Sequence, residues 1–152
     1  MDELPDVSVL MKDIGPWVDA AQVIQHGEGV WSIVLDEDFV IEAEQDGDRD
    51  MLVLTVSLGA PPAGEEAAMH SLLLQTNALW RDTGAVRLGL DGPEGDVVLM
   101  ADVPLKGLDV DGLGSRLHRY TDAALGWREV VAKTSPDSFE GDTKALEGML
   151  RI

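Results

Sequence analysis

Apolar side chains recur at helical spacing near both ends of the chain. The first set predicts a short helix that stops at Gly15-Pro16, because the proline ring removes a backbone donor; it comprises Leu4, Val7, Leu10, Met11 and Ile14. The second set predicts a long last helix capped by Asp109; it comprises Val110, Leu113, Leu117, Tyr120, Ala124 and Val131. Residues 17–24 are also apolar, but their pattern leaves helix and irregular chain both open.

The middle of the chain follows a period of two. Residues 30–35, 39–44 and 51–58 are rich in β-branched and alternating apolar positions, and acidic turns separate them, which predicts three strands. Two further strands are expected at 85–90 and 96–103, on either side of a turn rich in Gly and Pro.

A central helix is expected over residues 65–81, ended by Gly84. Its core stripe would be Ala68, Met69, Leu72, Leu73, Thr76, Leu79 and Trp80. The opposite face carries small or apolar residues where a solvated helix would carry charge: Ala67, Ser71, Leu74 and Ala78. We therefore expect something to pack on that face as well.

The element order α-β-β-β-α-β-β-α indicates an α+β fold, a five-stranded antiparallel sheet packed with three helices. Residues 1–132 are expected to form a single domain. Residues 133–152 are polar, contain Pro136 and two glycines, and are expected to be a flexible C-terminal tail.

Composition narrows the class of function. The 152 residues include 29 Asp or Glu and 11 Lys or Arg, which gives a formal charge of −18 and disfavours binding to nucleic acid. The longest apolar runs, 51–54 and 97–101, are far shorter than the ~20 residues of a membrane span, so no membrane insertion is expected. Zero cysteines suit a reducing cytoplasm, where we expect the protein to reside.

No motif for chemistry is complete. Residues 46–50 copy the first ligands of a calcium loop, but Met51 and Ser57 stand where Gly and Glu are required, so no metal site is expected. The histidines His26, His70 and His118 form no metal-binding pair, and the glycines form no phosphate-binding loop. We therefore expect no catalytic residue and no cofactor, and the protein should not be an enzyme.

A binding surface is the remaining indication. The strands carry apolar residues off their main buried face, among them Val40, Val53, Val98 and Met100. Large exposed apolar patches mark partner sites, whereas a fully packed core with ordinary surface exposure would explain the same residues. The pattern alone leaves both open.

Several local strings, in order, resemble one family. They are WSIVL at 31–35, LVLTVSLGAPP at 52–62, LLLQTNALW at 72–80, GAVRLGLD at 84–91 and GDVVLM at 95–100. Together with the first helix and a last helix ending at Trp127, they resemble the class I type III secretion chaperones, the Tir chaperone (CesT-like) family.

The resemblance implies a homodimer that binds the N-terminal segment of a secreted effector and keeps it soluble and partly unfolded for export. It implies a dimer interface at Ala67, Ser71, Leu74, Ala78, Val86 and Leu88. It implies an effector-binding groove at Val9, Met11, Ile14, Ile33, Leu35, Val40 and Ile41. The alternative is a dimeric α+β binding or regulatory module unrelated to secretion.

Overall fold

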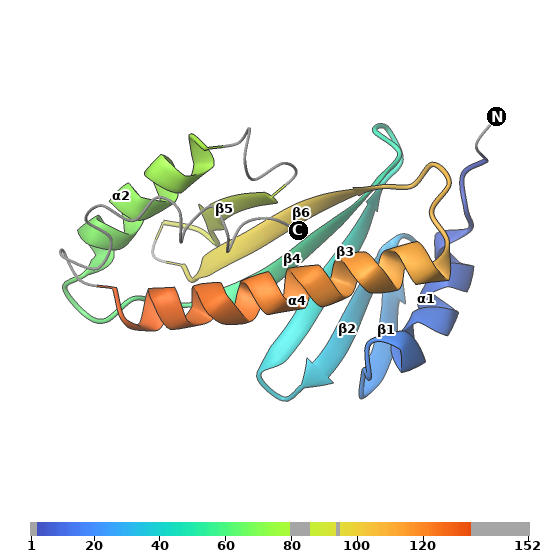
Figure 1. The fold of residues 1–152 in the computed structure, drawn as a ribbon, viewed down its shortest axis with the longest axis horizontal. Coiled ribbons are helices and arrows are strands. Elements are labelled where there is room, and N and C mark those ends of the chain that lie inside the picture. Colours follow the sequence, from blue (N-terminus) through green and yellow to red (C-terminus); the bar gives the residue numbers. More distant parts are fainter. Residues whose placement is uncertain (1–2, 80–85, 94, 135–152) are drawn as a thin grey trace. The chain divides into compact units, whose positions relative to one another are not determined.

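The structure of the protein is a computed structural model that describes residues 3–79, 86–93 and 95–134. Figure 1 labels the elements along the chain. They are α1 (Val7–Trp17), β1 (Gln22–Gly27), β2 (Val30–Asp36), β3 (Phe39–Asp46), β4 (Met51–Gly59), α2 (Glu66–Asn77), β5 (Val86–Leu90), β6 (Val97–Pro104) and α4 (Val110–Ala132).

The strands form one sheet in the order β1-β2-β3-β4-β6-β5, and the pairings from β1 to β4 are antiparallel. The predicted α+β class with three helices is confirmed. The prediction of five strands was wrong, because β1 is a sixth. Only Val23 and Ile24 of β1 are apolar and no β1 residue is fully buried, as is common for an outermost strand, so the alternation that reveals the other strands is missing.

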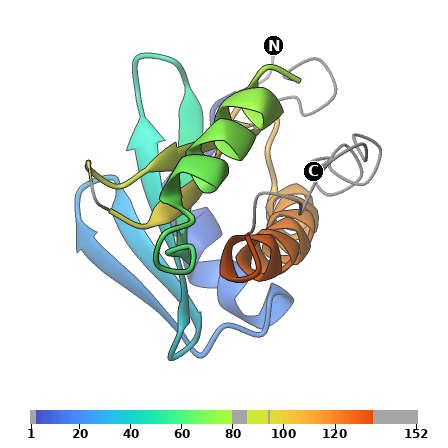
Figure 2. The same ribbon diagram turned by 90° about the vertical axis from the view of Figure 1, so that its left-hand side faces the viewer.

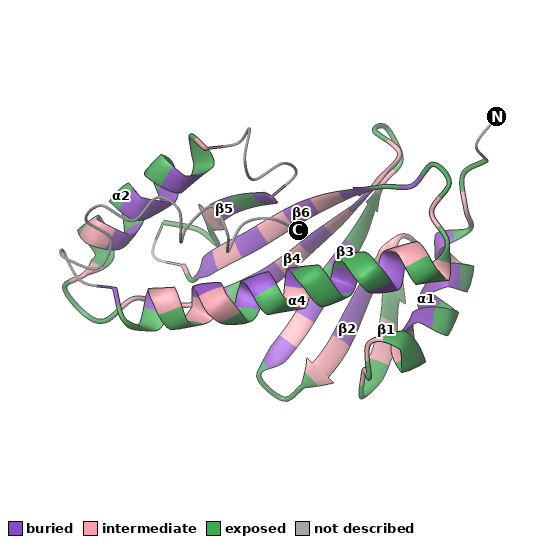
Figure 3. Ribbon diagram, in the orientation of Figure 1, coloured by how far each residue is buried: buried purple, intermediate pink, exposed green. Residues whose placement is uncertain are grey.

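Two compact units make up the chain, and the first contains residues 1–56 and 101–118. In this unit β3 and β4 each have one buried face and one face that is exposed or half-buried (Figure 3). β2 also buries Ser32 on its other face, and no residue of β1 is fully buried. The apolar core includes Val7, Leu10, Met11, Ile14, Trp31, Ile33, Ile41, Ala43, Leu52, Leu54, Leu113 and Leu117. The helical stripe of α1 and the odd positions of β2 and β3 therefore supply one common interior.

The second unit contains residues 57–100 and 119–152. Its core includes Met69, Leu72, Leu73, Val86, Leu88, Val97, Leu99, Tyr120, Ala124 and Trp127. The Tyr120 hydroxyl donates a hydrogen bond to the Leu99 carbonyl, so the buried phenol is satisfied. Helix α2 lies along β5, as Figure 2 shows. The expected single domain over 1–132 stays a prediction, and the expected tail lies outside the described residues from 135 onward.

Two helix ends differ from the predictions. Helix α1 begins after Asp6, whose carboxylate accepts from the Ser8 N–H at 3.0 Å, and it continues through Pro16 to Trp17. Proline is tolerated there because it removes only one hydrogen bond of the last turn. Helix α2 ends at Asn77, and the Leu79 N–H then donates a hydrogen bond to the Thr76 carbonyl, three residues back. Gly84, the predicted end of the helix, lies outside the described residues.

Helix α4 begins as predicted, since Asp109 Oδ1 accepts from the Gly112 N–H at 2.8 Å. Gly114, a poor helix residue, has a packing reason. A Cβ on Gly114 would lie 3.2 Å from a ring carbon of Trp17. The His118 ring also contacts this corner, with Nε2 3.0 Å from the Trp17 carbonyl oxygen. The glycine thus leaves room for the Trp17 side chain to approach α4 closely.

The acidic turn at 46–50 is held by an ion pair. Arg49 Nε lies 2.6 Å from Asp46 Oδ2, and Arg49 Nη1 lies 3.3 Å from Asp102 Oδ2. The hydrogen bond from Arg49 holds the pKa of the Asp46 carboxyl below its ordinary value. Within the described ranges no group of three or more His, Cys, Asp or Glu side chains could hold a metal ion.

We expect Arg49→Gln to raise the pKa of Asp46 toward its ordinary value, because the neutral amide no longer favours the carboxylate. A lowered pKa in the folded protein contributes stability above the ordinary pKa of aspartate, and this contribution disappears as the pH falls through the lowered value. An NMR titration of the Asp46 carboxyl carbon measures the change. An unchanged titration midpoint in the variant would show that Arg49 is not the cause.

Candidate functional site

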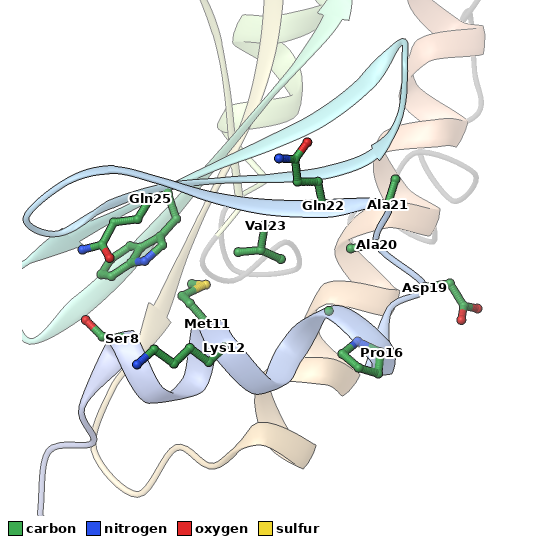
Figure 4. A pocket seen from close by; sticks show the side chains of 12 residues that line it. Ser8, Met11, Lys12, Pro16, Asp19, Ala20, Ala21, Gln22, Val23 and Gln25 are labelled. Carbon is green, nitrogen blue, oxygen red and sulfur yellow. The ribbon is translucent and has the colours of Figure 1, made fainter.

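A cavity of about 750 Å³ opens between α1 and β1 in the first unit (Figure 4). Helix α1 and the turn after it contribute Ser8, Met11, Lys12, Gly15, Pro16, Asp19, Ala20 and Ala21, while β1 and β2 contribute Gln22, Val23, Gln25 and Trp31. The volume lies within the range of ~300–1,000 Å³ that is usual for ligand pockets.

The cavity combines an apolar lining with polar groups. Met11 and Trp31 are almost fully buried, and Val23 is half-buried beside them. In Figure 4 the Met11 thioether and the Val23 side chain point into the space between helix and strand. Lys12 and Asp19 are the charged residues of the lining, and both are exposed. Such a surface suits a peptide that places an apolar side chain in the cavity while its backbone stays in polar surroundings.

The strand that borders this cavity is the first in the sheet order. β1 pairs with β2 on one side, with Val23 opposite Ile33 and Gln25 opposite Trp31. Within the part of the chain that the structure describes, no other strand pairs with β1. An unpaired strand edge offers backbone donors and acceptors to an extended peptide.

The seven residues that the resemblance placed in an effector-binding groove separate into two sets by burial. Met11, Ile14, Ile33 and Ile41 are at most 2% exposed, so they belong to the core of the first unit. Val9 is 51% exposed, and Leu35 and Val40 are half-buried. Of the seven, Met11 alone lines the cavity. That these residues bind an effector segment stays a prediction.

Most of the cavity lining was missed from sequence. Gly15, Pro16 and Ala21 form no apolar stripe, and Gln22 to Gln25 lack the alternation of a strand with a buried face. The one available signal was the polar-apolar-apolar-polar string at 22–25, which is compatible with an edge strand.

The predicted dimer residues also fall into two sets. Ala67, Ser71, Leu74 and Ala78 are all exposed, and Leu74 has 74% of its surface open to solvent. Val86 and Leu88 are 6% and 5% exposed and belong to the core of the second unit. Of the predicted dimer residues, only Ala67, Ser71, Leu74 and Ala78 are therefore exposed, and we call these four residues the α2 face. Their place in a dimer interface stays a prediction.

A polar cluster joins β1, β2 and β3. The Ser32 hydroxyl donates to Glu42 Oε2 at 2.8 Å, and His26 Nε2 lies 2.6 Å from the same serine oxygen. Because the only hydroxyl proton is directed to Glu42, His26 must donate from Nε2. In a nucleophilic triad the serine donates to the histidine instead, so this arrangement does not activate Ser32.

The profile of the Tir chaperone protein (CesT) family matches residues 22–128, which contain every strand and most of the helical residues described above. The chain belongs to this family. A Tir chaperone (CesT) family member is a chaperone of type III secretion, so the predicted resemblance is confirmed. A protein of Chlamydia pneumoniae, CPj0713/CpB0740, is 30% identical over 93 residues, which cover 60% of this chain and 70% of that protein.

Solved structures share the fold of this CesT family chain. One chain of the ExsC–ExsE complex superposes with a TM-score of 0.71 at 20% identity, covering 89% of this chain and 100% of that one. A chain of the HopA1–SchA chaperone–effector complex gives 0.65 at 20% identity, covering 81% and 93%. A chain of the ExoU–SpcU complex from the type III secretion system of Pseudomonas aeruginosa gives 0.55 at 21%, covering 81% and 97%.

No helix in the described ranges of this CesT family protein combines the length and apolar character that crossing a bilayer requires.

Proposed function

We propose that this chaperone acts as a homodimer that binds the N-terminal segment of a secreted effector in extended form, keeping it soluble and partly unfolded before export. The observation that carries the proposal is the cavity between α1 and β1, next to an unpaired strand edge, in a chain of the CesT family.

The cavity and the edge suit an extended guest because they satisfy its two requirements together. A strand added to β1 would form backbone hydrogen bonds, and its alternate side chains would point to the face that carries Val23 and Trp31. The thioether of Met11 can adapt to different apolar side chains, since it is unbranched and flexible. The proposal therefore needs no fixed guest sequence, only apolar residues at alternate positions.

The α2 face supports the homodimer. Its four residues are uncharged and exposed; Ala67, Ser71 and Leu74 lie on one side of α2, and Ala78 is the residue that follows the helix. A two-fold axis would bring the same face of each copy together. The mechanism is binding without turnover in the cytoplasm, and no cofactor takes part. The formal charge of −18 would help to keep a complex with an apolar guest soluble.

Co-expression with the protein encoded beside this chain tests the proposal. We expect that partner to be soluble only when it is co-expressed with this chaperone. Its isolated N-terminal segment should bind to the purified chaperone. Mass measurement on the free chaperone tests the homodimer separately. A monomer, or a partner equally soluble alone, would contradict the corresponding part of the proposal.

We expect Val23→Asp to weaken binding of that N-terminal segment by about 100-fold, because a charge in the apolar lining would lose its hydration when the guest enters. Isothermal titration with the synthetic segment measures the affinity. Ile24→Asp is the matched control: Ile24 is the next residue of β1, is also half-buried, and lies opposite Ser32 on the other face of the sheet. Equal losses in the two variants would place the guest elsewhere.

A further inference from the structure

The side chain of Asn77 bonds to the backbone of β5 at two points. Its amide Nδ2 donates to the Leu88 carbonyl at 2.7 Å, and its Oδ1 accepts from the Leu88 N–H at 2.9 Å. Asn77 is the last residue of α2, and Leu88 is the middle residue of β5. One side-chain amide thus makes the pair of hydrogen bonds that a residue on a neighbouring strand would make.

The geometry shows which edge of β5 this amide occupies. In a strand, the N–H and the carbonyl of one residue point to the same side. β6 is the only neighbour of β5 in the sheet order among the described residues, so β5 is an outermost strand. Because both Leu88 groups are taken by Asn77, they point away from β6, toward the edge where a further strand would pair.

The edge at β1 has no corresponding contact. Among the described residues, the side-chain hydrogen bond to the backbone of this strand runs from Gln25 Nε2 to the Gly27 carbonyl, beyond the positions 22–25 that pair regularly with β2. The sheet therefore has one edge whose central residue is closed by a side chain and one whose regular positions are open.

We infer that Asn77 closes the β5 edge of the sheet to strand addition, so that a strand can be added only at β1. Unpaired edges invite association through strand pairing, and proteins prevent it with local devices at the edge. By this inference, Asn77 prevents a strand of a second copy from pairing with β5. Copies that associate must then do so through side chains such as those of the α2 face. The consequence for an effector segment, which is directed to β1, rests on the proposed function.

Asn77→Ala, studied without any guest, tests the inference. We expect the Leu88 amide to exchange with solvent about fivefold faster or more in the monodisperse variant at low concentration, because its acceptor is lost. With rising concentration we expect species larger than the wild-type assembly in sedimentation velocity, formed through the freed edge. Gln75→Ala is the matched control, since Gln75 is an exposed amide of the same helix whose side chain donates to the Ser71 hydroxyl and not to the β5 backbone among the described residues.

A second substitution separates edge closure from a general loss of packing. Leu90 is 37% exposed at the end of β5, and a lysine there should discourage strand pairing, so Asn77→Ala/Leu90→Lys should sediment like the wild type. An Asn77→Ala variant that keeps the wild-type mass at every concentration would overturn the inference. If the variant fails to fold, hydrogen exchange of the Leu88 amide is measured in the wild type at several protein concentrations. Protection from exchange that is independent of concentration supports the inference, and protection that rises with concentration overturns it. None of these outcomes depends on guest binding.

Discussion

Ile33→Asp is expected to unfold the protein or bring it close to unfolding. Ile33 is 0% exposed in the core of the first unit, opposite Val23 on β1 and Ile41 on β3. Truncating a buried isoleucine costs ~2–5 kcal/mol, and an unpaired buried carboxylate adds to that loss. A domain has only ~5–15 kcal/mol of stability in total. Urea unfolding followed by circular dichroism measures the effect.

Val34→Asp is the control for this substitution. Val34 is the next residue of β2, lies on the other face, is half-buried and pairs with Val40. We expect it to cost ~1 kcal/mol, the range of a cross-strand pair. The opposite outcome is also informative: an Ile33→Asp protein that folds with wild-type stability but no longer binds its guest would place Ile33 on the guest surface, as the sequence analysis predicted.

The strands with one buried face were predictable because the alternation of apolar and polar residues in their sequences matches the alternation of side chains between the two faces of a strand. The alternating strand predicted over 51–58 and the predicted cap at Asp109 were confirmed, since both depend on neighbours within a few residues. β1 was not predictable in the same way. An outermost strand half covered by α1 has no face that must be apolar throughout, so its residues carry little periodic signal.

The cavity was harder still, because it exists only where α1 meets β1. Period-two alternation says which residues share a face, but it does not say whether that face meets a helix of the same chain or a guest. Ile33 and Ile41 are buried in the same core as Met11 and Ile14 of α1, which is why residues expected in a groove are core residues instead. The α2 face was predictable, because an exposed helix face without charge is visible from the sequence alone.

Leu74→Asp is expected to weaken self-association by about 100-fold or more, the loss typical of a central interface residue of ~2–4 kcal/mol. Leu74 is the most exposed large apolar side chain described, at 74%, and it lies at the centre of the α2 face. Its exposure means that the folded single copy should tolerate the charge, so the melting of a dissociated variant should stay cooperative. Sedimentation equilibrium measures the dissociation constant.

Leu125→Asp makes the comparison decisive, because it introduces the same charge at another exposed leucine of the second unit. Leu125 is 50% exposed on α4 and lies outside the α2 face. If only Leu74→Asp dissociates, the loss arises from the α2 face and not from the added charge on an already acidic protein. Equal dissociation of both variants would point to charge repulsion between copies, which added salt should reverse. An unchanged dimer in Leu74→Asp would exclude the α2 face as the interface.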